Sequence, residues 1–102
     1  MKVKQMSTSA NNPAPNQFII HHDRAVYFQS YNDIIIKQSK GVTYLDKYAW
    51  ARTVTTGKYR NIFLKETKKE TLAKIASGEY ILTDLNNQKE PQIANSQQLA
   101  YQ

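Results

Sequence analysis

The segment AVYFQSYNDIIIKQSKGVTYL, residues 25–45, decides the fold. It alternates runs of β-branched and aromatic residues, which favour strands, with short groups of turn-forming residues. Asn32-Asp33 supplies the first turn, and Ser39-Lys40-Gly41 supplies a hairpin loop in which the glycine can take a positive φ. The segment therefore predicts three strands of an antiparallel meander. They span residues 25–30, 34–36 and 42–45, and a short apolar run at 18–20 precedes them.

The second half of the chain changes from strand to helix periodicity. Thr67-Lys68-Lys69-Glu70 is a capping box, in which each end residue's side chain accepts a hydrogen bond from the other's amide. Gly78 supplies a C-terminal stop. The sequence predicts a helix over residues 68–77 and a final strand over 79–83. The apolar face of that helix is expected to consist of Leu72, Ile75 and Ala76.

Residues 48–65 are ambiguous between strand and helix. A strand over 58–64 would mix polar and apolar residues on both faces, whereas a helix capped by Thr55 or Thr56 separates them better. We therefore expect a helix over 57–65, with a strand there left open. The preceding residues 48–54 alternate in polarity and favour an extended segment.

The two ends differ in composition from the middle. Residues 1–17 contain Asn-Asn-Pro-Ala-Pro, and residues 86–102 are dominated by Asn and Gln. Neither end can bury enough apolar surface to offset the entropy lost on ordering. We expect a disordered N-terminal tail at 1–17, a single α+β domain at 18–85 and a disordered Asn/Gln-rich tail at 86–102. The expected fold is a small antiparallel sheet of about four strands with one or two short helices on one face.

A core of this size is small, so a homodimer that buries a further face is left open. The 102 residues include no cysteine and no apolar stretch long enough for a signal core or a membrane span. We therefore expect no membrane partner and a location in the cytoplasm of the cell that makes the protein.

The residues that usually carry catalysis are scattered. There are eight acidic residues, most of them in predicted turns or caps, no cysteine nucleophile, and only three glycines. A phosphate loop would need more glycines close together. His21 and His22 are adjacent on a predicted strand and point to opposite faces, so they cannot readily share one metal ion. We expect no enzymatic activity, no cofactor and no metal site.

Positive charge is concentrated between residues 37 and 74. This region holds ten basic and three acidic residues, a net charge of +7, within a chain of net charge +6. Such a concentration is typical of a protein that binds a polyanion, although lysines on solvated faces are the plainer explanation. The residues expected to contact phosphates are Arg52, Lys58, Arg60, Lys65, Lys68 and Lys69.

Two further features bear on nucleic-acid binding. Tyr48, Trp50 and Tyr59 stand among the basic residues and could stack on bases, but a small domain needs its aromatic residues for the core. A helix-turn-helix motif is disfavoured, because about two residues join the predicted helices and no glycine lies between them. The basic residues therefore support the hypothesis better than the aromatic residues do.

Several short motifs resemble a group of small uncharacterised proteins encoded by phages, plasmids and integrated elements of low-GC Gram-positive bacteria. The group's pattern is an aromatic-Ser-Tyr start, a Tyr-Leu strand, a Trp, and Thr-Thr-x-Lys-Tyr or His before Phe-Leu. Relatives tend to have Asp-Tyr-Ser where this chain has Ala51-Arg52-Thr53. The resemblance implies a mobile-element origin and no particular activity. The matching motifs are Phe28-Gln29-Ser30-Tyr31-Asn32, Val42-Thr43-Tyr44-Leu45-Asp46, residues 50–59, Phe63-Leu64 and Ser77-Gly78-Glu79-Tyr80.

The sequence as a whole favours a non-enzymatic accessory protein of a phage or mobile element. It would bind nucleic acid, with DNA the first to test, through a basic surface within residues 37–74. An alternative is a protein–protein inhibitor of a host factor such as a defence nuclease, since a small basic and aromatic protein suits that role equally. A structural or assembly component of the element is a third alternative.

Overall fold

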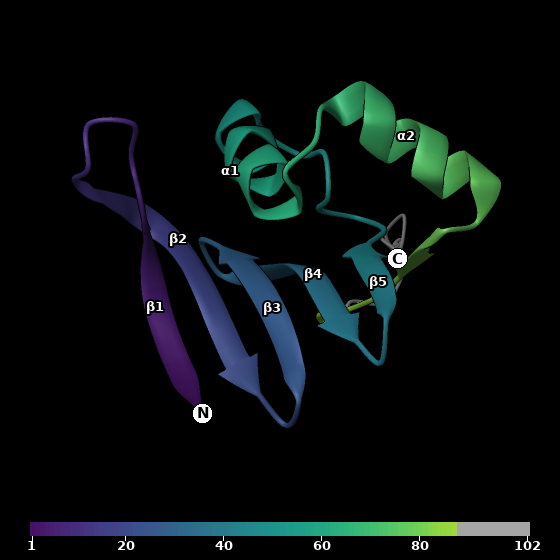
Figure 1. The fold of residues 1–102 in the computed structure, drawn as a ribbon, viewed down its shortest axis with the longest axis horizontal. Helices are drawn as coiled ribbons and strands as arrows, with labels where there is room; N and C mark the ends of the chain where they lie inside the picture. Colours follow the sequence, from purple (N-terminus) through teal and green to yellow (C-terminus); the bar gives the residue numbers. More distant parts are fainter. Residues whose placement is uncertain (88–102) are drawn as a thin grey trace, which may run out of the picture.

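A computed structural model describes residues 1–87, which form one six-stranded sheet and two helices (Figure 1). The strands lie in the sheet in chain order. Neighbours from β1 to β5 are antiparallel, whereas β6 pairs with β5 in parallel. Both helices lie on one side of the sheet (Figure 1). The elements are β1 (Lys2–Ser7), β2 (Pro13–His22), β3 (Ala25–Ser30), β4 (Asp33–Ser39), β5 (Val42–Asp46), α1 (Val54–Leu64), α2 (Lys68–Ser77) and β6 (Tyr80–Thr83).

The predicted fold class, an antiparallel sheet of about four strands, is therefore wrong. The sheet has six strands and is mixed. Its parallel pair has a physical cause in the chain order, because two helices stand between β5 and β6. A helical crossover returns the chain to the end of the sheet where β5 begins, and the next strand then runs in the same direction as β5.

The N-terminal residues 1–17, expected to be a disordered tail, form β1 and the first half of β2. β1 is an edge strand whose residues pair with β2, for example Val3 with Ile20, and only Met6 in it is buried. An edge strand gains its order from the backbone ladder of its neighbour, so a polar composition does not prevent it from forming. Of the tail predicted at 86–102, residues 88–102 lie outside the described part of the chain.

The core lies between the sheet and the helices. The ring of Phe28 on β3 stacks against Phe63 on α1, with the ring centres 5.8 Å apart. A β-bulge in β4 places both Ile35 and Ile36 in the interior, since Phe28 pairs with Ile36 and the next residue of β3 pairs with Ile34. The buried apolar residues are Met6, Ala14, Ala25, Phe28, Ile35, Ile36, Leu45, Ala49, Tyr59 and Tyr80.

The helix predicted over residues 68–77 is confirmed, with both hydrogen bonds of its capping box and Gly78 at φ 86°. The first helix begins earlier than expected. Its N-cap is Thr53, whose hydroxyl accepts a hydrogen bond from the amide of Thr56 at 3.1 Å. The expected caps Thr55 and Thr56 both lie inside α1, and the hydroxyls of Thr56 and Ser30 share a buried hydrogen bond of 2.8 Å.

Glu66, between the two helices, joins α2 to β6. Its side chain is only 4% exposed, and it accepts hydrogen bonds from Lys74 Nζ at 2.7 Å and the Tyr80 hydroxyl at 2.9 Å. The hydroxyl of Thr71 donates a third, at 2.5 Å. Burial alone would raise the pKa of the Glu66 carboxyl, but these hydrogen bonds and the charge of Lys74 outweigh burial and lower it.

Replacing Glu66 with glutamine is expected to lower the free energy of unfolding by about 2 kcal/mol at neutral pH, because an amide cannot accept all three hydrogen bonds. The folded pKa of Glu66 lies below the unfolded value of about 4.3. The stabilisation by the carboxylate is therefore complete above the unfolded pKa and is lost as the pH falls through the folded pKa. The stability difference between the two proteins should shrink below about pH 4, which urea unfolding at several pH values would measure.

Glu79→Gln is the matched control, since Glu79 is exposed. It should have little effect at any pH. A Glu66→Gln difference that stays constant from neutral pH to pH 3 or so would contradict the assigned ionisation.

Candidate anion-binding site

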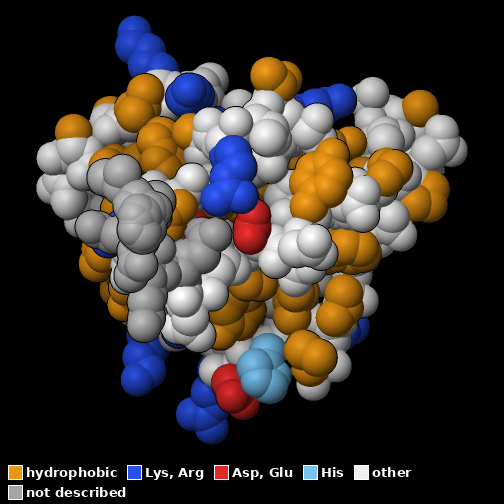
Figure 2. Space-filling view, turned by 180° about the vertical axis from the view of Figure 1, so that it is seen from behind, with side chains coloured by type: hydrophobic (Ala, Val, Ile, Leu, Met, Phe, Trp, Pro, Cys, Tyr) orange, Lys and Arg blue, Asp and Glu red, His pale blue; other side chains and the backbone are white. Residues whose placement is uncertain are grey.

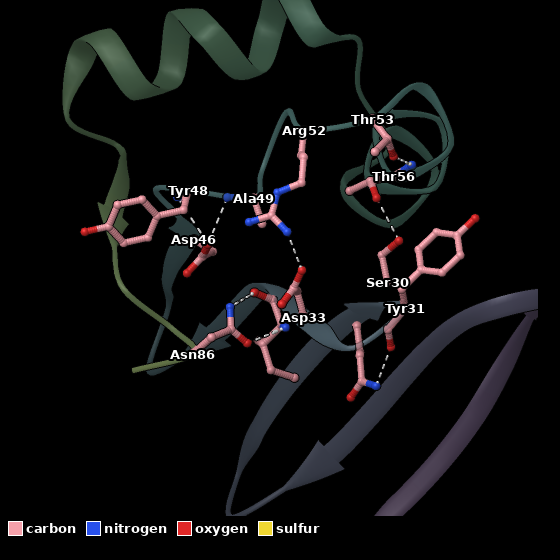
Figure 3. A network of polar contacts seen from close by, with 12 residues as sticks. Ser30, Tyr31, Asp33, Asp46, Tyr48, Ala49, Arg52, Thr53, Thr56 and Asn86 are labelled. Atoms are coloured by element: carbon pink, nitrogen blue, oxygen red, sulfur yellow. Dashed lines mark hydrogen bonds and ion pairs between the residues drawn. The ribbon is translucent and has the colours of Figure 1, made fainter. Parts of the chain in front are cut away.

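The loop from β5 to α1 is fixed by Asp46, the last residue of β5. The fully buried Asp46 carboxylate accepts hydrogen bonds from the amides of Tyr48 and Ala49 through Oδ2, at 3.1 and 2.9 Å. Its Oδ1 accepts another from the amide of Leu85 at 2.8 Å. Figure 3 shows the two bonds to Tyr48 and Ala49. Residues 47–52 therefore form turns, and the extended segment predicted at 48–54 is wrong. A carboxylate that binds the amides of the residues after it favours a turn over continuation of the strand.

A cavity of about 450 Å³ opens between this loop, the first half of α1 and the start of α2. Four of its lining residues are basic, and none of those in the described part of the chain is acidic. The basic residues come from three separate segments, which the fold brings together. The lining residues are Ala51, Arg52, Thr53, Val54, Gly57, Lys58, Arg60, Asn61 and Lys68.

The N-terminus of α1 forms one wall of the cavity, since Thr53, Val54 and Gly57 line it. The first turn of α1 contains no acidic residue. The amides at a helix N-terminus carry partial positive charge, so acidic residues normally stabilise this position and anions bind there. The positive end of α1 and the four basic side chains therefore add to one positive potential in the cavity.

Arg60 differs from the other three basic residues because it is only 2% exposed. Its Nη1 donates to the Trp50 carbonyl at 2.7 Å, its Nη2 donates to Asn61 Oδ1 at 3.0 Å, and its guanidinium lies 5.2 Å from the centre of the Trp50 ring. Within residues 1–87 its Nε has no hydrogen-bond partner and no carboxylate forms an ion pair with it. Burial lowers the pKa of Arg60, and the charge of Glu66 opposes this.

A second cavity of about 300 Å³ adjoins the first, and Arg52 and Thr53 line both. Arg52 Nη1 donates to Asp33 Oδ2 at 2.7 Å across this second cavity (Figure 3). On the other side, the Ser30–Thr56 hydrogen bond holds the start of α1 on β3 (Figure 3). The β3–β4 hairpin thus contacts both the loop after β5 and the start of α1 beside the second cavity.

The structure separates the six basic residues expected at the site. Arg52, Lys58, Arg60 and Lys68 line the cavity. Lys65 is instead the C-cap of α1, with φ 58°, and Lys69 lies exposed in the first turn of α2. Thr53, Gly57 and Asn61 also line the cavity but were not expected there. No sequence signal marked Gly57, because the predicted helix over 57–65 begins at this residue and glycine is disfavoured only in helix interiors.

The aromatic residues near the cavity serve mainly in packing. Tyr59 is buried, and Trp50 packs against the core, so neither ring stands free to stack on a base. Lys58 Nζ lies 5.5 Å from the centre of the Tyr59 ring. Phosphate rather than base contacts are therefore the chemistry that this cavity offers.

Other kinds of site find less support in residues 1–87. In that range, no group of three or more His, Cys, Asp or Glu side chains is placed to hold a metal ion. His22 Nε2 contacts Asp23 Oδ2 at 3.3 Å, at the exposed turn between β2 and β3. No helix within those residues is both long and apolar enough to cross a membrane.

Comparison with known proteins gives a match at the level of a family. No curated protein and no solved structure is significantly similar to the chain. Residues 1–79 match a family of unknown function, DUF8033. The match includes β1, β2, both helices and every residue that lines the basic cavity. The chain therefore belongs to the DUF8033 family.

Proposed function

We propose that this protein binds nucleic acid through the basic cavity, as a non-enzymatic accessory protein of a phage or another mobile element. The observation that carries the proposal is the gathering of four basic side chains, without an acidic one among the described lining residues, at the N-terminus of α1. The resemblance of residues 28–85 to proteins of phages and plasmids supports the biological setting. The expected location is the cytoplasm of the bacterial host.

Protein stability explains Arg52, which pairs with Asp33, but not the lysines at the cavity. Lys68 and Lys69 begin α2, and Lys58 lies within the first half of α1. Cations at helix N-termini oppose the helix dipole, and like charges around one cavity repel each other. A phosphate anion in the cavity would relieve both effects. Local conflicts of this kind are expected at binding sites, where function outweighs stability.

The double variant Lys58→Glu, Lys68→Glu should weaken DNA binding at least about tenfold and lower the slope of log affinity against log salt by about 2, since two phosphate contacts are lost. Fluorescence anisotropy with labelled single- and double-stranded DNA, at about 50 and 200 mM salt, measures both quantities. Wild-type binding should weaken steeply between these salt concentrations.

The control is Lys2→Glu, Lys4→Glu, which makes the same change in net charge on exposed residues of the edge strand β1. It should reduce affinity much less than the cavity variant does. Equal losses from both variants would show only a general effect of charge. The absence of wild-type binding at low salt would refute the proposal.

One observation favours the alternative, an inhibitor of a host protein. On the sheet face away from the helices, one residue from each of the six strands lies next to its cross-strand partner, and together they form a row across the sheet. Both ends of the row, Val3 and Ile81, are exposed. In the view from behind, hydrophobic side chains form several surface patches (Figure 2). A protein partner could cover such a face. The row consists of Val3, Ile20, Tyr27, Lys37, Tyr44 and Ile81.

A further inference from the structure

Gly57 occupies a position in α1 where the fold does not require glycine. It lies in the first part of the helix and does not have a positive φ. A Cβ added there would lie 3.6 Å from both Nη1 and Nη2 of Arg60, which is ordinary van der Waals contact. Alanine would therefore fit, and it would favour the helix by about 0.5–1 kcal/mol over glycine. What a methyl group would change is the space beside the guanidinium, because it would occupy the position next to both nitrogens where Gly57 and Arg60 line the cavity.

The two nitrogens beside Gly57 are well suited to an anion. Each carries two N–H groups, and each uses one of them, toward the Trp50 carbonyl or toward Asn61 Oδ1. Each therefore keeps one N–H. Two neighbouring donors on one planar guanidinium match two oxygens of a phosphate. Within residues 1–87, no carboxylate neutralises this buried charge by an ion pair.

Because Arg60 is buried, a phosphodiester and a phosphate monoester differ in how easily they can reach it. A phosphodiester inside a strand has a sugar on both sides and only two unsubstituted oxygens. To reach Arg60, it would have to bring both sugars into the cavity. A phosphate monoester has three unsubstituted oxygens and close to two negative charges at neutral pH. It could contact Arg60 and the α1 N-terminus while Lys58 and Lys68 lie around it at the cavity wall.

We propose that Gly57 and Arg60 form the floor of a socket for a phosphate monoester, namely the terminal phosphate of a nucleic-acid strand. This inference rests on the proposed nucleic-acid binding and names the part of the strand that the cavity recognises. The other three basic residues that line the cavity, Arg52, Lys58 and Lys68, then hold the phosphates that follow the terminal one. They supply the affinity that does not depend on the strand end.

The test compares one single-stranded oligonucleotide in three forms: with a 5′-phosphate, with a 3′-phosphate and with hydroxyls at both ends. Wild-type protein should bind one phosphorylated form at least tenfold more tightly than the hydroxyl form. Gly57→Ala should remove this difference without lowering the midpoint of thermal unfolding. The fluorescence of Trp50, the only tryptophan, reports occupancy independently, because its ring contacts the Arg60 guanidinium.

Inorganic phosphate serves as the competitor, with chloride at equal ionic strength as its control. It should abolish the advantage of the phosphorylated strand at millimolar concentration and leave the weaker binding of the hydroxyl form. Equal affinity for all three oligonucleotides would overturn the socket but leave nucleic-acid binding intact. Inorganic phosphate that binds as tightly as the phosphorylated strand would also overturn it, since the strand would then contribute nothing. If no oligonucleotide binds at low salt, both proposals fail.

Discussion

Asp46→Asn should lower the midpoint of thermal unfolding by roughly 10–20 °C, because the change costs about 3 kcal/mol in a domain of this size. Both carboxylate oxygens of the fully buried Asp46 accept hydrogen bonds from backbone amides. Asparagine keeps one acceptor oxygen and places an NH₂ group against amides that are themselves donors. At least one of the three amides then loses its partner.

The matched control is Asp23→Asn, the same chemical change at an exposed turn. Asp23 has φ 51°, a conformation that asparagine tolerates well, and its side chain is 85% exposed. Its unfolding midpoint should stay within a few degrees of wild type. Thermal unfolding followed by circular dichroism measures both variants. Equal midpoints for Asp46→Asn and Asp23→Asn would show that the loop does not depend on the Asp46 carboxylate.

Local interactions account for the parts of the fold that the sequence predicts well. The capping box at Thr67 and the stop at Gly78 lie within a few residues of the helix they bound, and both are present. The strands of the 25–45 segment form for a similar reason, since tight turns join consecutive antiparallel neighbours. Their sequence carries both the strand propensity and the turn chemistry.

Two of the errors, at β1 and β6, occur where order comes from distant partners. β1 has one buried residue, Met6, so its sequence lacks the alternation of apolar and polar residues that would predict a strand. It is ordered by pairing with β2. The parallel pairing of β6 depends on the crossover through both helices rather than on the sequence of β6 itself. The two predicted helices before the last strand indicate this pairing, since two helices between two strands favour parallel pairing in the same sheet.

The candidate site was predictable in composition but not in arrangement. Charge counting finds the basic residues, and four of the six line one cavity. It gives no sign that Arg60 is buried, because arginine is rarely buried so fully. The Asp46 turn leads to Trp50, whose carbonyl accepts a hydrogen bond from Arg60 and so helps to hold this lining residue of the cavity. That contact joins residues ten positions apart, and no sequence motif predicts it.

Arg60→Met should weaken binding of a 5′- or 3′-phosphorylated oligonucleotide by at least about 30-fold, because truncating a buried charged contact costs 2 kcal/mol or more. Stability should change little. The variant leaves the Trp50 carbonyl without its donor, but it also removes a buried charge that no carboxylate within residues 1–87 pairs with. Replacing buried charges with apolar side chains of similar volume is often neutral or stabilising.

Arg60→Lys separates the charge of Arg60 from its shape. Lysine keeps the positive charge but lacks the planar pair of N–H groups, so binding should fall between that of wild type and Arg60→Met. Anisotropy measures the affinities, and thermal unfolding measures the stability of the same samples. If Arg60 were only a structural residue, Arg60→Met would melt well below wild type while binding the phosphorylated strand with unchanged affinity. Loss of affinity in a protein that melts normally would instead assign the Arg60 guanidinium to the ligand.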